Sequence, residues 1–576
     1  MLSPSRWLLC VARSHRKLAF ETVCRLYHWL IGVQRVKIPT EFIKGRCYRS
    51  RHCHSSAIRN ERFPGSTVHV NTMRYEFVGR GARSFPGGLR TESLHATGMA
   101  IALSILLLSV SSPSQAQDAT SAARFDAYGV KGWNFPFPSA ADSLIQDAGG
   151  FRSALAEYGF GFLNFNVTVG GVNAGGTPHG VPDSSFVPSL GRSLPYPECS
   201  VSSGPICRGG QTYFGQRPSY YNVSLAYLTY DTSRWGIPDG QIVLGATKVN
   251  SSYQDYFPTT DLGLMGLSWY QTLFNKRLEL KVGYTTNNQE FVGTYVGGSF
   301  ANPFGPTASV PVQLGMSIGP TPTPSIRATV HLTSEIYNST AVQRSLPING
   351  RTGNPIKDEL DSNPSGFKLR VPNAGTLYIN ELGYKNDAAP NRPHNWVRAG
   401  VMYNTSEFRD YSRFSANPAA TTNGSWGIYV LGDRQLWQQA PGSPYSAYRG
   451  LYAGLSYMYA PPKNVVFSQY LEGRLYWIGP FDSRPTDMLS FVYSHNRMSG
   501  YLVNTVNSTT APLADQGYPV PRAARSSNSY SLSYLAHITP GLYASLAGNY
   551  TDKPSFQYFA GQGSAWTVQL ALTTVF

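Results

Sequence analysis

The chain has 576 residues, of which 14% are charged and 13% are aromatic, so it is poor in charge beside the roughly 25% of an average soluble protein. Its net charge of +16 is uneven, because residues 1–116 contain 17 Lys and Arg against 5 Asp and Glu, whereas the remainder contains 31 against 27. The body of the chain is therefore nearly neutral and lacks the basic cluster that a phosphate-binding face needs, which excludes nucleic acid as its main partner.

The first predicted element is the apolar run "MAIALSILLLSV", Met99 to Val110, which is followed by "SSPSQAQD". Such a run is too short for a membrane-spanning helix, which needs about 20 residues, but it suits the hydrophobic region of a secretory signal. Ser114 and Ala116 are the small residues that a signal peptidase reads. We therefore predict a signal peptide over residues 99–116; a buried core helix is the alternative.

Residues 1–98 form a leader of doubtful status, because secretory signals normally lie within about 30 residues of the N-terminus. We expect translation to begin at Met73 or nearby. The stretch "CYRSRHCH", which begins at Cys47, falls in this leader and lacks the paired spacing of a zinc module. We therefore predict no metal site, and nothing in the sequence indicates a cofactor.

Residues 117–160 are predicted to form an N-terminal segment with one short helix. In "SLIQDAGGFRSALAEYG", Phe151, Leu155 and Tyr158 share one helical face, and Gly149-Gly150 would interrupt or kink the helix.

Cys199 and Cys207 stand in the Pro/Gly/Ser-rich stretch "CSVSSGPIC". After export into an oxidising compartment they would form a disulfide most simply; two free thiols are the alternative.

Residues 161–576 show the period-two alternation of strands. It is clear in "FLNFNVTVGG" from Phe162, "RLELKVGY" from Arg277, "SIRATVHLT" from Ser325, "LEGRLYW" from Leu471 and the terminal "SAWTVQLALTTVF". In each strand one face is apolar and the other polar or charged. A soluble sandwich would turn the apolar face into a core, whereas a transmembrane barrel turns it towards lipid.

Length and loop pattern favour the barrel. The segment shows no repeated domain unit, and at about 10 residues per strand it can supply roughly 16 to 18 strands. Short connections, such as those at Asn275 and Thr539 to Gly541, alternate with long polar ones, such as Asn338 to Thr376 and Gly500 to Asn528. We therefore predict an all-β fold, a transmembrane antiparallel β-barrel, with its apolar strand faces outward.

Three stretches in this order resemble the carbohydrate-selective porins of the OprB family: "GGFRSALAEYGFGFLNFNVTVGGVNAGG", "YQTLFNKRLELKVGYTTNNQEFVG" with "SFANPFG", and "YLEGRLYWIGPFDSRPTDMLSFVYSHNRMSGY". The resemblance runs from about Asp142 to Phe576. It implies about 16 strands in a bacterial outer membrane, a segment near Asp142 to Tyr158 packed at or inside the pore mouth, and passive diffusion of sugars such as glucose. The terminal Phe576 looks like the signal that the barrel assembly machinery reads.

A diffusion pore needs polar groups on its inner wall rather than a catalytic group. A charged residue facing lipid would cost about 2 to 4 kcal/mol for Arg or Lys at the membrane midplane, so charged positions are placed inward. By this parity the pore-lining candidates are Arg277, Glu279, Lys281, Arg327, His331, Arg398, Glu472, Arg474 and Tyr476.

Two other functions fit a barrel. A membrane-embedded hydrolase could use His495 and Asn496, but His495 shares the parity of Leu489 and Phe491 and no nucleophile motif accompanies it. A non-conducting structural or adhesive barrel would have the same sequence pattern. We expect a sugar porin that is not an enzyme, with outer-membrane lipids as its surroundings; the oligomeric state is not readable.

Overall fold

The computed structural model describes residues 122–576 except 135–136, 176–180, 182–183, 188–191, 196–209, 254–258, 294–308, 444–445, 516–520 and 559–562. The predicted leader, the signal peptide and the pair Cys199 and Cys207 lie outside the described residues and stay predictions.

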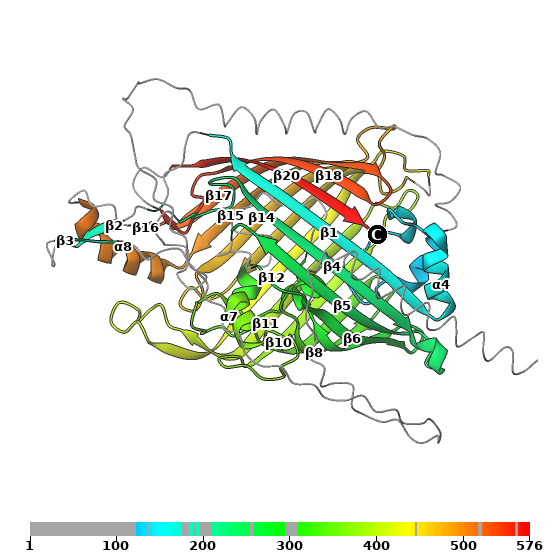
Figure 1. Cartoon of the computed structure of the whole chain (residues 1–576), viewed down its shortest axis with the longest axis horizontal. Helices are drawn as coiled ribbons and strands as arrows, with labels where there is room; N and C mark the ends of the chain where they lie inside the picture. The colour runs from blue at the N-terminus through cyan, green and yellow to red at the C-terminus, as the bar shows by residue number, and fades with distance from the viewer. Residues whose placement is uncertain are drawn as a thin grey trace, which may run out of the picture. The chain divides into compact units, whose positions relative to one another are not determined.

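Sixteen antiparallel strands close into one barrel, which confirms the predicted fold class (Figure 1). Each strand pairs with its neighbours in the chain, and β1 closes the barrel against β20. The barrel strands are β1 Phe160–Asn173, β4 Ser219–Asp231, β5 Gly240–Ser251, β6 Gly263–Leu273, β7 Leu278–Thr285, β8 Thr323–His331, β9 Ile336–Arg344, β10 Thr376–Asn386, β11 Asn395–Arg409, β12 Thr421–Gln438, β13 Gly450–Tyr459, β14 Phe467–Ile478, β15 Met488–Met498, β17 Ser526–Thr539, β18 Leu542–Thr551 and β20 Ala565–Val575.

The remaining elements are short. Two small strand pairs, β2 Ser184–Val187 with β3 Arg192–Pro195 and β16 Arg522–Ala523 with β19 Gln557–Tyr558, stand apart from the barrel sheet. The helices are η2 Ala123–Tyr128, η3 Ala140–Asp142, η4 Ala148–Gly150, α4 Phe151–Glu157, η6 Thr232–Trp235, α5 Asn287–Phe291, α6 Ser309–Gln313, α7 Pro355–Ser362 and α8 Gly500–Asp515. No helix in the described part of the chain is long and apolar enough to span a membrane.

The pairing of β1 with β20, which closes the barrel, extends to the last residue of the chain. Phe165 on β1 stands opposite Val575 on β20. Beyond that pair, the backbone N–H of Phe576 donates to the carbonyl of Asn164 at 2.9 Å, and the N–H of Asn164 donates back at 3.1 Å. The C-terminal residue is thus hydrogen-bonded into the barrel, and its proposed role as an assembly signal stays a prediction.

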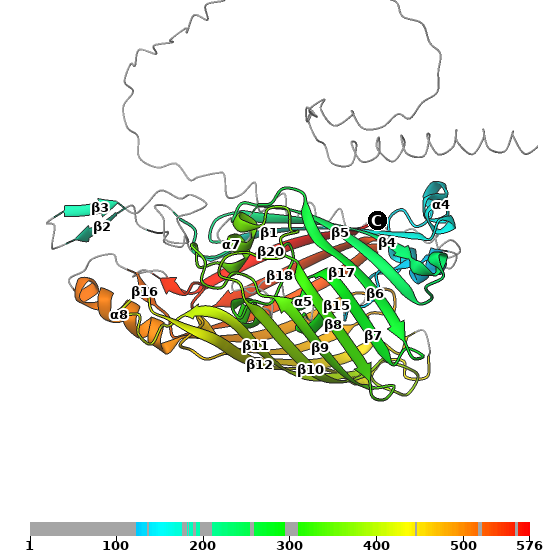
Figure 2. The ribbon, with the colours of Figure 1, turned by 90° about the horizontal axis from the view of Figure 1, so that it is seen from below.

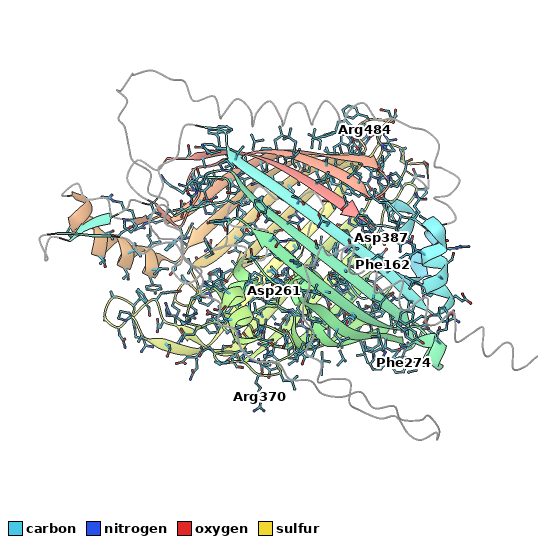
Figure 3. The ribbon with its side chains drawn as sticks, viewed as in Figure 1. Phe162, Asp261, Phe274, Arg370, Asp387 and Arg484 are labelled. Carbon is cyan, nitrogen blue, oxygen red and sulfur yellow. The ribbon has the colours of Figure 1, made fainter. Side chains whose placement is uncertain are left out.

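The two ends of the barrel differ in their connections. Short connections join the strands at the end where α4 and the C-terminus lie, which we call the turn end. Figure 3 shows Phe274, Asp387 and Arg484, from three of these connections, towards that end. The long connections, with α7 and α8, lie at the opposite end, which we call the loop end (Figure 2). This asymmetry matches the predicted alternation of connection lengths.

Most strands turn their apolar face outward, as predicted. Ile326 on β8, Leu475 on β14 and Leu546 on β18 are exposed, whereas their polar neighbours Arg327 and Arg474 are buried. The exposed apolar side chains form the surface that lipid covers in a transmembrane barrel.

The prediction was wrong for β1, whose apolar face points inward. Leu163 and Val169 are buried, whereas Asn166 shares the outward parity of the exposed Val172 and hydrogen-bonds to Ser224 on β4 at 2.7 Å. The inner face of β1 is apolar because other apolar segments of the chain cover it from inside the barrel.

Two predicted connections also differ. The first residues of the expected loop from Asn338 to Thr376 belong to β9, which ends at Arg344, and α7 lies in the remainder. The connection from Gly500, which we predicted only as long and polar, contains the 16-residue helix α8. The α8 sequence carries no strong apolar period, since Asn, Ser and Thr occupy its centre and Pro512 lies inside it.

Candidate functional site

A loop folds back into the barrel between β7 and β8. It carries α5 and α6, and its side chains Phe291, Val310, Leu314 and Met316 are buried in one apolar cluster. The cluster includes inward-facing side chains of β9 to β14. The inward loop, as we call residues 286–293 and 309–322, therefore reduces the cross-section of the barrel.

Amide side chains hold the inward loop to the wall on both sides. Asn287 Nδ2 donates to Gln343 Oε1 on β9 at 2.7 Å, and Asn404 Nδ2 on β11 donates to the carbonyl of Leu314 at 2.7 Å. Gln313 Oε1 accepts from the backbone N–H of Phe467 on β14 at 3.0 Å. The contacts reach across six strands, so the loop position is defined by the wall as a whole.

Glu290 on α5 is the ionic contact of the inward loop. Its Oε1 lies 2.5 Å from Lys281 Nζ on β7, and its Oε2 lies 2.9 Å from Arg327 Nη1 on β8. Arg327 also faces Glu279 at 3.7 Å, and Glu279 lies 2.8 Å from His331 Nε2. Because Glu290 and Lys281 are only 1% and 2% exposed, each depends on its ionic partner in place of water.

The N-terminal segment contacts the same wall. Lys281 Nζ lies 5.3 Å from the ring centroid of Trp133, within the range of a cation–π contact. Trp133 and Phe137 lie 5.6 Å from the ring of Tyr227 on β4, and both pack on the inner face of β1. Trp133 and Phe137 therefore lie inside the barrel. The segment for which the resemblance implied a place at or inside the pore mouth, Asp142 to Tyr158, begins at the turn end, where Asp142 binds His537 and Gly541.

A second group is centred on Glu381 of β10. Its two carboxylate oxygens accept hydrogen bonds from Tyr337 on β9 at 2.9 Å and Tyr429 on β12 at 2.8 Å. Gly383 stands opposite Tyr337, and a Cβ there would come within 2.2 Å of the Tyr337 ring, so glycine makes room for the tyrosine. Beside this group the guanidinium of Arg398 lies 3.9 Å from the Trp396 ring centroid.

A third group surrounds Arg474 of β14. Its guanidinium lies 2.9 Å from Asp433 on β12 and 2.5 Å from Glu472, and the Arg474 side chain is fully buried. Tyr476 donates to Asp433 at 3.1 Å, and its ring stacks on Tyr452 at 5.0 Å. The inner wall here presents charges and flat aromatic rings side by side.

The structure places the nine predicted pore-lining residues as follows. Six are buried on inward strand faces: Lys281, Arg327, Arg398, Glu472, Arg474 and Tyr476. Glu279 and His331 are partly exposed, with 23% and 33% of their side chains accessible. Arg277 precedes β7 and is exposed at the turn end. Their role in conduction stays a proposal.

Sequence reasoning missed three acidic residues of these groups. Glu381 and Asp433 stand at inward positions of β10 and β12, so a scan of "TLYINELGYKN" and "GIYVLGDRQLW" for alternation could have found them. Glu290 has no periodic signal, because it lies in the inward loop, although it falls within the family-like stretch "TTNNQEFVG". Among the described residues, no group of three or more His, Cys, Asp or Glu could hold a metal ion.

Asp142 fastens the N-terminal segment at the turn end. Its carboxylate accepts hydrogen bonds from His537 Nε2 and the Gly541 N–H, both at 2.9 Å, and from the Tyr543 hydroxyl. Burial alone would raise the pKa of Asp142, but the hydrogen bonds from His537, Tyr543 and Gly541 outweigh it and hold the pKa below its usual value of 3.8. The stabilisation is therefore present above pH 3.8 and is lost as the pH falls through the lowered value.

We expect Asp142→Asn to loosen this attachment at neutral pH. Losing hydrogen bonds to a charged group costs about 1 to 3 kcal/mol, so hydrogen exchange of peptides from 137–160 should accelerate roughly tenfold. In the wild type the same acceleration should develop as the pH falls below about 4, after correction for intrinsic exchange. Asp239→Asn, at an exposed position in the connection after β4, is the matched control. Unchanged exchange in Asp142→Asn would show that other contacts hold the segment.

Comparison with known proteins gives the following matches. The family model described as "Carbohydrate-selective porin, OprB family" matches residues 233–557. The high-pH structure of Pseudomonas putida OprB is similar with a TM-score of 0.59 and 17% identity, covering 75% of this chain and 97% of that one, which supports the barrel fold. The low-pH structure of the same protein has a TM-score of 0.44 and 14% identity, covering 76% and 100%. No curated protein matches the chain.

Proposed function

The chain belongs to the OprB family of carbohydrate-selective porins of bacterial outer membranes, whose model matches more than half of it, and from this premise we propose that it passes small neutral sugars such as glucose by passive diffusion. The observation that carries the proposal is the inner wall beside the inward loop, where ionic side chains and aromatic rings alternate.

The charge of this wall suits a neutral solute. The cations Lys281, Arg327, Arg398 and Arg474 stand among five carboxyl groups. The carboxyl groups are Glu279, Glu290, Glu381, Asp433 and Glu472. Because opposite charges nearly balance, the wall attracts neither anions nor cations strongly, yet it offers many hydrogen-bond donors and acceptors.

Passage requires these groups to replace part of the water around the sugar and to release it quickly. Glu279 and His331, whose side chains are 23% and 33% accessible, are the members of these groups that a sugar hydroxyl or water can reach. Aromatic rings such as Trp396 give a flat apolar surface for the C–H face of a pyranose. No bond is made or broken, and the concentration gradient alone drives the flow.

Liposome swelling with the refolded chain from Gln117 to Phe576 tests the proposal. We expect fast swelling with glucose, slower swelling with an amino acid of similar size, and slow swelling with a larger oligosaccharide. The zwitterionic amino acid is the informative control, because it matches glucose in size but carries charges whose water the paired wall charges do not replace. Equal rates for glucose and the amino acid would contradict sugar preference. No swelling from a folded barrel would favour the non-conducting structural or adhesive barrel.

A further inference from the structure

A groove lies on the outward face of the barrel at the loop end, beneath the first turns of α8. It has a volume of about 560 Å³. Strands β13, β14 and β15 contribute Tyr459, Gln469 and Arg497 to its lining, and Tyr501 of α8 overhangs them. Figure 1 shows α8 beyond the strand ends at the loop end. The groove is separate from the sugar pathway, because Arg497 shares the outward parity of the exposed Phe491.

The groove is cationic. Arg497 and Arg525 line it and are both exposed. Its lining lies wholly within the described residues and contains no carboxylate. Arg525 Nη2 donates to Asn504 Oδ1 at 3.3 Å. Arg497 is exposed, and its backbone carbonyl accepts from Ser468 Oγ at 3.2 Å. Two such guanidinium groups favour a ligand with phosphate oxygens, which they can bind in a bidentate manner.

A row of aromatic side chains below the groove indicates where the hydrocarbon of the membrane meets the head groups. Tyr493, Tyr530, Tyr550 and Trp566 follow one another across β15, β17, β18 and β20, with ring centroids 5.2, 6.3 and 4.8 Å apart. Tyr530 and Trp566 are exposed on the outward face. Outward Tyr and Trp of this kind lie at the boundary between hydrocarbon and head groups.

Arg497 lies above this boundary on the side away from the hydrocarbon. It follows Tyr493 by four residues on β15, which is about 13 Å along the strand, or roughly 10 Å along the membrane normal for a strand tilted by about 40°. Head groups occupy the first 5 to 8 Å or so beyond the hydrocarbon, and an arginine side chain can reach back into that layer. The loop end faces outside the cell, so this layer belongs to the outer leaflet.

We propose that this groove binds the phosphorylated head group of an anionic outer-leaflet lipid, with Arg497 and Arg525 on its phosphate and the aromatic row against its acyl chains. The occupant is a lipid and not a soluble anion, because the cationic groove continues directly into the outward apolar wall. His495 also lines the groove, with its Nδ1 2.8 Å from Asn528 Oδ1. Asn528 in turn donates to Asp552 at 2.8 Å, so this carboxylate already has a partner.

Binding of diphosphoryl lipid A to the refolded full barrel in neutral detergent, counted by native mass spectrometry, tests the assignment. We expect one lipid to be retained, and Arg497→Gln and Arg525→Gln each to weaken its binding about tenfold. Arg351→Gln removes another exposed positive charge, which lies 3.5 Å from Asp361 in the connection between β9 and β10, and should leave binding unchanged. Glucose swelling should be unaffected in all three variants, which confirms that each barrel is folded and separates this proposal from the sugar-porin function.

Four results would overturn the proposal. Equal weakening of binding by Arg351→Gln and Arg497→Gln would show unspecific charge attraction. Equal retention of the monophosphoryl and diphosphoryl lipids, both by the wild type and by Arg497→Gln, would show that the phosphate makes no contact. Displacement of the lipid by inorganic phosphate at equal concentration would assign the groove to a soluble anion. A changed oligomeric mass of Arg497→Gln without lipid loss would assign it to a second copy.

Discussion

Replacing Glu290 with Gln should loosen the α5 part of the inward loop and let solutes larger than glucose pass. The substitution keeps the shape of the side chain but leaves Lys281 and Arg327 buried on the wall without their shared carboxylate. Breaking a buried ion pair in this way costs about 3 to 5 kcal/mol. That cost shifts the equilibrium between the inward position of the loop and a displaced position by a factor on the order of a hundred to a thousand. Single-channel conductance and swelling with a trisaccharide should both increase.

Two variants separate loop release from a general loss of charge. Glu157→Gln removes an exposed carboxylate at the end of α4 and should leave trisaccharide exclusion unchanged. Lys281→Met added to Glu290→Gln removes the stranded ammonium and should restore part of the exclusion. Glu290 lies in α5 and takes no part in the hydrogen bonds between the barrel strands. Each variant should therefore still show the heat-modifiable gel migration of a folded barrel. If a folded Glu290→Gln variant excludes the trisaccharide as the wild type does, the ion pair does not position the loop.

Replacing Arg474 with Ala should destabilise the barrel more than any change on its outward face. Asp433 and Glu472 would be left buried with no cation between them, at a cost of about 3 to 5 kcal/mol. Gly454 stands between the strands that carry them, and a Cβ there would come within 2.3 Å of Asp433 Oδ1, so the site is built to hold the guanidinium closely. The urea midpoint in phosphatidylcholine vesicles, followed by tryptophan fluorescence, should fall markedly.

The matched control lies one residue from Asp433. Arg434→Ala removes an arginine from the outward face of the same strand, where a charge near the membrane interface costs about 0 to 1 kcal/mol, so the urea midpoint should stay unchanged or rise slightly. A triple variant, Arg474→Met with Asp433→Asn and Glu472→Gln, removes all three charges and should recover most of the lost stability, because no unpaired buried charge remains. An unchanged urea midpoint in Arg474→Ala would show that water reaches the two carboxylates.

Alternation in the sequence predicted the inward positions of most wall residues. Lys281, Arg327 and Arg474 could be placed because a charge facing lipid is costly, so parity alone separates the two faces of a strand. The same rule failed for β1, since parity shows that a strand has two faces but not what covers each one. Leu163 and Val169 face inward because Trp133, Phe137 and Phe214, from distant parts of the chain, cover them.

By itself, then, the sequence determined that this protein is a closed transmembrane barrel, because strand period, strand length and the need to pair every backbone group in lipid are local properties. The porin type was implied by the family resemblance. Only the tertiary structure decided which residues meet inside it. Glu290 reaches Lys281 and Arg327 because the inward loop folds across the wall, and Asp433 reaches Arg474 across β13. Such contacts depend on strand register and loop path, which residue spacing along the chain does not contain.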